Sequence, residues 1–147
     1  MSTITTRFTH DHRRSDEGFA ALEAALLTGS VDAALGAWET LQAELQHHFL
    51  IEEEALFPAF EAATGMNGGP TEVMRLEHAQ IRELFAPLAS ALEAKETEAA
   101  RDLLETLLVM LQQHNMKEEN VLYPMCDQVL GAGQQEALVQ RLAANSP

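Results

Sequence analysis

Apolar residues recur every three or four positions along most of the chain, which is the spacing that places them on one face of an α-helix. No segment keeps the strict apolar and polar alternation of a half-buried strand. Four long helices follow from this pattern, over residues 8–28, from Ser30 to Gly65, from about residue 70 to a turn at 95–97, and from there to Gly131. A short fifth helix is predicted over residues 134–144. The predicted class is therefore all-α, a four-helix bundle followed by a short C-terminal helix.

Three prolines fall inside these apolar patterns. Pro87 lies within the third helix, where its missing N–H and its ring should bend the chain near Glu83 without ending the helix. Pro58 and Pro124 lie near the ends of the second and fourth apolar patterns. We expect each of them to bend or end its helix.

One stretch of the second helix returns in the fourth. Residues 48–58 read HFLIEEEALFP, and residues 114–124 read HNMKEENVLYP, at an offset of 114 − 48 = 66 positions. Residues i and i+4 lie on the same helix face, so His48 is beside Glu52 and His114 is beside Glu118. An imidazole and a carboxylate in this arrangement are suited to bind one metal ion.

The same offset relates His12 to His78, so the chain consists of two similar helical hairpins. The midpoint of residues 12 and 48 is 30, and that of 78 and 114 is 96, and both fall in predicted turns. In antiparallel helices these midpoints place the histidines at the same height, and the midpoint of residues 52 and 78 falls at the turn near residue 65. An up-down-up-down bundle should therefore bring six potential metal ligands to one level of its core: His12, His48, Glu52, His78, His114 and Glu118.

Two carboxylates are costly to bury without a cation, because they would take up protons until they were neutral. Six ligands are too many for one tetrahedral zinc ion, but two five- or six-coordinate ions that share bridging glutamates would use all of them. A mixed set of imidazoles and carboxylates suits two iron ions best, with manganese or zinc as substitutes. The alternative is that the histidines are ordinary hydrogen-bonded core residues and the glutamates are solvated.

Several neighbours of these six residues have less certain roles. Carboxylates beside a ligand can accept a hydrogen bond from an imidazole N–H, although they are equally expected to be simply solvated. Tyr123 belongs to the same outer set, with core packing as its alternative. The outer candidates are Asp11, Glu53, Glu77, Glu119 and Tyr123.

The remaining histidines and the single cysteine are assigned no role in the centre. His47 is rotated about 100° from the ligand face and is predicted to lie at the surface. His10 would reach the centre only if the start of the first helix were frayed. Cys126 is predicted to be a small buried thiol.

Composition restricts the partners. The chain has 147 residues and carries 9 basic and 23 acidic side chains, a net charge of −14. This balance argues against nucleic acid and anionic membranes as partners. The length suits one domain over residues 1–147, with a bundle core at about 8–128. The sequence has no apolar run of the signal-peptide or membrane-spanning type, so we expect a cytoplasmic protein.

These motifs, together with D-H-R-R at Asp11–Arg14 and E-H-x-x-I-R at Glu77–Arg82, resemble the hemerythrin-like family of HHE cation-binding domains. The resemblance covers about residues 8–128. It implies a four-helix bundle with a non-haem di-iron centre (Fe–O–Fe type, with carboxylate bridges) held by the six predicted ligands. Oxygen-carrying hemerythrins have a further histidine where this chain has Arg82, and they have H-x-x-x-x-D where it has His114 and Glu118. The four-histidine, two-glutamate set is more similar to the branch linked to iron–sulfur repair and nitric oxide chemistry.

We therefore expect a di-iron protein that binds or senses O2, NO or hydrogen peroxide in the response to iron, nitric oxide or oxidative stress, with an unknown electron donor. Two alternatives stay open. One is a di-iron enzyme for nitric oxide reduction, peroxide breakdown or iron–sulfur repair, although the sequence offers no catalytic residue and no dedicated proton donor apart from Tyr123 and the outer acids. The other is a metal store, or a bundle in which the metal is only structural.

Overall fold

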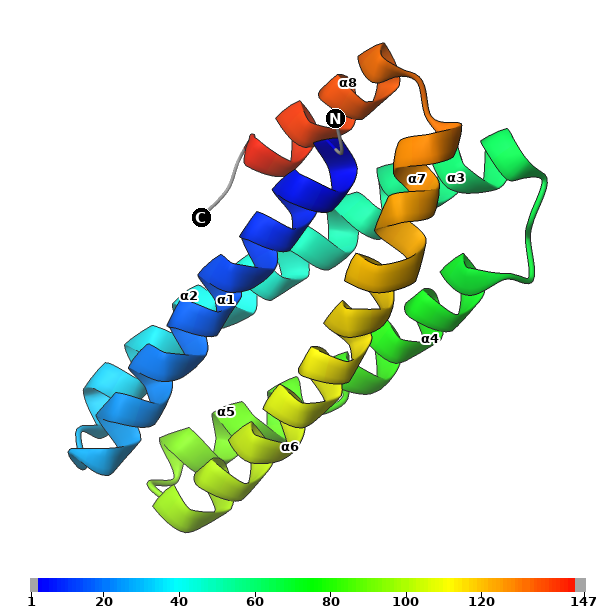
Figure 1. The fold of residues 1–147 in the computed structure, drawn as a ribbon. Helices are drawn as coiled ribbons and strands as arrows, with labels where there is room; N and C mark the ends of the chain where they lie inside the picture. The colour runs from blue at the N-terminus through cyan, green and yellow to red at the C-terminus, as the bar shows by residue number, and fades with distance from the viewer. Residues whose placement is uncertain (1–2, 145–147) are drawn as a thin grey trace.

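The computed structural model describes residues 3–144, and these residues form helices and turns without any strand. Figure 1 shows the arrangement. The elements are α1 (Thr3–Leu27), α2 (Val31–Ile51), η1 (Glu52–Leu56), α3 (Phe57–Thr64), α4 (Pro70–Arg82), α5 (Phe85–Glu93), α6 (Thr97–Lys117), η2 (Glu118–Leu122), α7 (Tyr123–Val129) and α8 (Ala132–Ala143). None of the helices in this part of the chain is long and apolar enough to cross a membrane.

Four long antiparallel helices are built from these elements. α1 is the first, α2–η1–α3 the second, α4 and α5 the third, and α6–η2–α7 the fourth. The short α8 folds back and packs against α1 and α2 at the end where the chain begins (Figure 1). The predicted all-α bundle with a short C-terminal helix is confirmed.

The turns lie where the sequence places them. Ser30 caps α2, since its side-chain oxygen accepts a hydrogen bond from the N–H of Ala33 at 3.3 Å. Gly29 and Gly65 follow the first and second helices with φ of 76° and 74°, a left-handed conformation that glycine adopts without a steric cost. Lys95, with φ of 60°, forms the turn between α5 and α6. These positions support the midpoint argument that aligned the ligands.

Two helix starts differ from the prediction. α1 begins at Thr3 and not near Phe8, because Asp127 of α7 caps it: the N–H of Ile4 donates to Asp127 Oδ1 at 2.8 Å, and that of Thr5 to Oδ2 at 3.2 Å. A residue more than 120 positions away supplies this cap. α8 begins at Ala132 and not at residue 134, so it includes Gly133.

The prolines act differently from one another. Pro87 acts near Glu83, the predicted place, because its ring would clash with the carbonyl of Glu83, but it interrupts the third helix at residues 83–84 and does not merely bend it. Before Pro58 and Pro124 the helix widens into the π-turns η1 and η2, and then continues. In each π-turn the N–H of the residue before proline donates to the carbonyl of a predicted ligand, Glu52 or Glu118.

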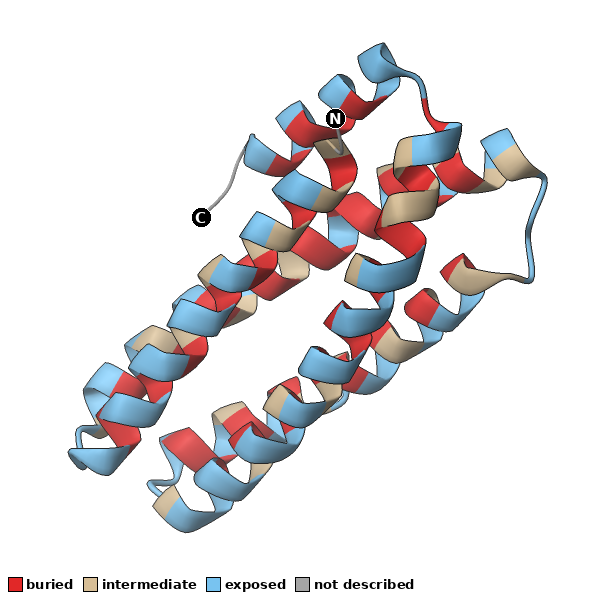
Figure 2. Ribbon diagram, in the orientation of Figure 1, coloured by how far each residue is buried: buried red, intermediate tan, exposed pale blue. Residues whose placement is uncertain are grey.

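The interior consists of two apolar clusters. One, around Trp38, fills the end of the bundle near the α1–α2 and α5–α6 turns, and the other, around Phe60, lies beneath α8. Buried positions form continuous inward stripes along the helices (Figure 2). On each helix the predicted ligands lie at the boundary between the two clusters, so the polar layer of the core has apolar packing above and below it.

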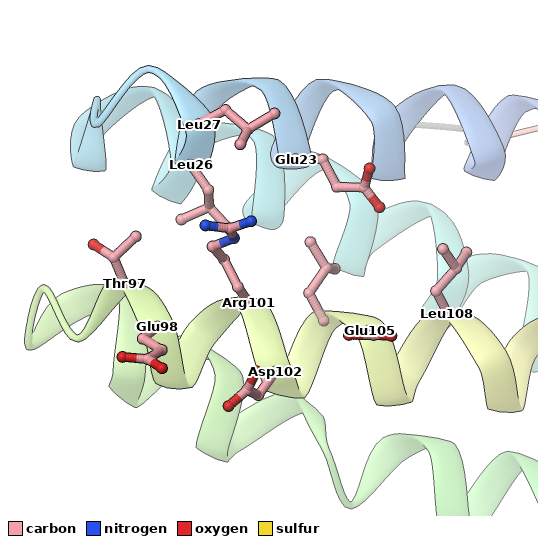
Figure 3. Close-up of a pocket in the computed structure, with 10 residues that line it drawn as sticks. Glu23, Leu26, Leu27, Thr97, Glu98, Arg101, Asp102, Glu105 and Leu108 are labelled. Carbon is pink, nitrogen blue, oxygen red and sulfur yellow. The ribbon is translucent and has the colours of Figure 1, made fainter.

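A cleft lies away from this polar layer. It has a volume of about 760 Å³ and opens between the C-terminal half of α1 and the N-terminal half of α6. Figure 3 shows Leu26, Leu27 and Arg101 on its walls. None of the residues that line it is a predicted ligand or a neighbour of one.

Candidate metal centre

The structure brings all six predicted ligands together in the core. They form two overlapping groups, in each of which the ligand atoms lie within 4.8 Å of one another. The first group contains His12, His48, Glu52 and Glu118, and the second contains Glu52, His78, His114 and Glu118. Every one of the six side chains is buried, and none is more than 5% exposed.

The two glutamates belong to both groups because their oxygens point in opposite directions. Glu52 Oε2 lies 3.3 Å from Nε2 of His48, and Oε1 lies 3.1 Å from Nε2 of His78. Glu118 Oε1 lies 3.1 Å from Nε2 of His12, and Oε2 lies 3.4 Å from Nε2 of His114. Each carboxylate thus offers one oxygen to each group, which suggests a binuclear site.

Four outer carboxylates form hydrogen bonds with the four imidazoles on the side that faces away from the two groups. Each accepts a hydrogen bond from an Nδ1–H: Asp11 from His48 (2.7 Å), Glu53 from His78 (2.7 Å), Glu77 from His114 (2.8 Å) and Glu119 from His12 (2.8 Å). A carboxylate only accepts, so each Nδ1 carries the hydrogen and each Nε2 presents its lone pair to the core.

The outer hydrogen bonds also follow the repeat. Asp11 and Glu77 are related by the 66-residue offset, as are Glu53 and Glu119. Each bond joins two different helices, and together the four bonds link all four helices of the bundle. An imidazole that is held in this way has a fixed tautomer and ring orientation, which is what a metal ligand requires.

The donor atoms of the second group fit a cation. Glu52 Oε1 and Glu118 Oε2 are buried without a hydrogen bond of good geometry. The Nε2 atoms of His78 and His114 face each other at 3.1 Å. With hydrogens on both Nδ1 atoms, two lone pairs would meet there, so a positive charge is needed between them. A metal ion would satisfy all four atoms.

Without a metal ion, the ligand side chains shift one another's pKa values. Burial opposes a charged His48, but the charge of Glu52 and the hydrogen bond to Asp11 outweigh it and raise the His48 pKa. Burial would likewise raise the pKa of Glu52, but His48 and the neighbouring hydrogen bonds hold it well below its ordinary value. The carboxylates of the centre are thus stabilised by whatever positive charge is nearest, a role that metal ions would take over.

Arg82, which stands where oxygen carriers have a histidine, supports the second group indirectly. Its guanidinium donates to both oxygens of Glu53, at 2.7 and 3.0 Å, and its Nε donates to Gln46 at 2.9 Å. Burial opposes the charge of Glu53, but the bonds from His78 and Arg82 lower its pKa to about 2. The sequence contained a signal for this contact, because Arg82 lies four residues after His78 on the same helix face.

Aromatic rings enclose the polar layer. Phe49 stacks on His78 with ring centroids 4.0 Å apart, and Phe8 contacts the edge of His48 at 5.7 Å. Tyr123 is fully buried, and its hydroxyl points into the first group. Burial and the charges of Glu118 and Glu52 raise the pKa of Tyr123 well above its ordinary value, so the phenol keeps its proton while no cation is near.

The other predictions had mixed outcomes. His47 was predicted to lie at the surface, which is wrong: it is half-buried and donates through Nε2 to the carbonyl of Leu142 at 2.8 Å, because α8 folds over it. His10 is exposed on α1 and takes no part in either group. Cys126 is a buried thiol as predicted, and burial above all raises its pKa to about 12.

Comparison with known proteins gave one finding. A family described as hemerythrin HHE cation binding domain matches residues 3–126. No curated protein and no solved structure matched the chain. The matched range contains all six predicted ligands and all four outer carboxylates.

Proposed function

Because the chain belongs to the hemerythrin HHE cation-binding family, we propose that it is a non-haem di-iron protein that binds or senses O2, NO or hydrogen peroxide. The binding site is the pair of overlapping groups in the bundle core. Iron, when bound there, supplies a change of oxidation state and coordination positions for a small ligand. The proposal places the protein in the response to oxidative, nitric oxide or iron stress.

The observation that carries the proposal is the sharing of the two glutamates. Each group receives two imidazoles and one oxygen from each glutamate, which makes four donors. An octahedral ion takes about six ligands, so each group leaves positions for solvent and for an external ligand. A purely structural metal site, in contrast, is usually closed by protein ligands.

The donor chemistry favours iron. Of the His, Cys, Asp and Glu side chains within residues 3–144, only histidines and glutamates make up the two groups, and Cys126, the one thiol, lies outside both. Thiolate ligands would have favoured zinc or an iron–sulfur cluster. Manganese, or zinc in vitro, is an expected substitute because both accept the same donors.

The surrounding residues determine which ligands can enter. Because the six ligand side chains are almost completely covered, the centre accepts only small molecules. The outer carboxylates keep each Nε2 directed at the metal positions, so that little rearrangement is needed when a metal or ligand arrives. The phenylalanine rings against His48 and His78 exclude bulk water.

The test is elemental analysis with an optical spectrum of protein purified without chelators, followed by anaerobic exposure to NO and, separately, to O2 and peroxide. We expect two irons per chain and a spectrum that changes with at least one of these molecules. Iron that is retained without any spectral response would instead favour a store or a structural metal. Absence of iron, with His48→Ala leaving stability unchanged, would refute the centre itself.

A further inference from the structure

The two groups are related by the 66-residue repeat, but one residue in contact with the ligands differs between the two halves. Tyr123 corresponds to Phe57, since 123 − 57 = 66. Both side chains are fully buried. Both follow a π-turn in which their own N–H donates to the carbonyl of a shared glutamate, Glu118 or Glu52. The backbone around Phe57 and Tyr123 is therefore alike, and the two side chains differ only by the hydroxyl group.

The hydroxyl oxygen of Tyr123 lies close to all four donor atoms of the first group. It is 2.5 Å from Glu52 Oε2 and 2.9 Å from Glu118 Oε1. It is 3.1 Å from Nε2 of His12 and 3.2 Å from Nε2 of His48. A phenol has one hydrogen to donate, so it cannot hydrogen-bond fully to four partners at once.

These distances are those expected between neighbouring ligands of one metal ion. Ligand atoms about 2.1 Å from an ion and at right angles to each other are about 3.0 Å apart. Neighbouring donors of the first group show this spacing, with 3.3 Å between His48 and Glu52 and 3.1 Å between His12 and Glu118. The phenolic oxygen keeps a similar spacing to all four, so it lies at a further ligand position and not where the ion itself would lie.

The second group has no such donor. The ring of Phe57 stacks on His78 with centroids 5.7 Å apart and planes at 24°. Glu52 Oε1 and Glu118 Oε2, the oxygens that face this group, have no hydrogen-bond partner, whereas the opposite oxygens are in contact with the Tyr123 hydroxyl. Among residues 3–144, only the two histidines and two glutamates form this group.

We infer that Tyr123 is a fifth protein ligand of the first metal position, bound as a phenolate, and that external ligands bind at the second position. On metal binding the O–H bond of Tyr123 breaks, its proton leaves to solvent, and the oxygen forms a bond to the ion, with no change in oxidation state. This inference rests on the proposed di-iron centre. Phe57 leaves the corresponding position of the second ion open.

The experiment compares ferric wild-type protein with Tyr123→Phe and with the exchanged double variant Phe57→Tyr/Tyr123→Phe. Iron per chain, visible absorption and resonance Raman spectra are recorded for each. We expect a phenolate-to-iron charge-transfer band with tyrosine ring modes in the wild type, its loss in Tyr123→Phe with iron retained, and its return in the exchanged variant. Thermal unfolding of each loaded variant verifies that the fold is intact.

Azide serves as a second probe, of the open position. Wild-type protein should bind azide, and the single variant Phe57→Tyr, which closes the second position, should bind it at least 10-fold more weakly with both irons retained. Two irons without phenolate modes in the wild type would overturn the tyrosine assignment and leave the di-iron centre standing. Wild-type protein that binds no iron would overturn both.

Discussion

The first and second groups of the centre share Glu52 and Glu118 and follow the same repeat, but residues around them differ, two of them in ways that bear on the ligands. Tyr123 in the first group corresponds to Phe57 in the second, and Asp16 corresponds to Arg82, since 82 − 16 = 66. The first group has an additional oxygen inside the ligand layer. The second has a guanidinium outside it, bonded to Glu53. The repeat thus accounts for the arrangement of the His and Glu side chains, and from these two differences we expect the two proposed metal positions to be unequal.

The largest expected effect is that of removing the metal. A metal ion that binds the folded chain and not the unfolded one stabilises the fold by about 4 kcal/mol at a free concentration 1,000 times its dissociation constant. Chelation should lower the free energy of unfolding by at least about that amount. The two glutamates that stay buried between the apolar clusters without a metal ion add to the loss. Urea unfolding followed by circular dichroism measures the change.

Chelation also compares the two positions. With one donor fewer, the second position should lose its metal first, so iron content should fall in two steps as chelator is added. In Tyr123→Phe the two steps should merge. A single step in the wild type would show that the two positions bind metal equally well.

Loss of a shared glutamate should affect both positions at once. Glu52→Gln keeps the size of the side chain but removes the charge that both groups use. We expect a fall in metal affinity of more than about 100-fold, since substitution of an outer partner alone already costs 10- to 100-fold. Iron titration followed by elemental analysis tests this, with Glu118→Gln as the matched variant. If one iron stayed tightly bound, the two groups would not share this carboxylate.

The fold and the six central residues could be predicted because they depend on local rules. Apolar periodicity predicted the helices. Two residues that are equally far in sequence from a turn lie at the same height, provided that both helices have the same rise per residue. The π-turns did not disturb this alignment, because each begins at a shared glutamate and extends away from the histidine before it. His12 therefore lies beside His48, and His78 beside His114, as the repeat predicted.

Other features depend on contacts between distant segments, and the sequence offers no local pattern for them. Asp127 caps α1, and α8 covers His47, only because the ends of the chain meet in the fold. The position of the Tyr123 hydroxyl depends on the side-chain direction after a π-turn, which periodicity does not specify. The sequence therefore left Tyr123 between an outer role and core packing, and its place among the ligands came from the structure alone.

The outer carboxylates should give selective, intermediate effects. Asp11→Asn weakens the hold on His48 and so the first position, whereas Glu77→Gln weakens the hold on His114 and so the second. We expect a 10- to 100-fold loss of affinity at one position in each case, because an amide accepts a weaker hydrogen bond than a carboxylate. The two-step chelation curve shows which position is weakened. Equal weakening of both positions by either variant would contradict the division into two groups.

The smallest expected effect is that of Arg82→Gln, which acts on the second position through two intermediates. Arg82 orients Glu53, and Glu53 orients His78. Glu53 keeps its bond to His78 in the variant, so the loss of affinity should stay below the roughly 10-fold expected for removing an outer carboxylate. The part-exposed Arg82–Glu53 pair itself should contribute about 1 kcal/mol or less to stability.

Asp16→Asn provides the matched control in the first half. Asp16 is exposed and lies within the electrostatic influence of His12 and Glu119, without the bidentate contact that Arg82 makes. Removing its charge should leave both steps of the chelation curve almost unchanged, whereas Arg82→Gln should shift only the step of the second position. If Arg82→Gln shifted the first step instead, the guanidinium would act through general charge and not through Glu53 and His78. Arg82→Lys separates these two explanations, because it keeps the charge but cannot form the bidentate contact.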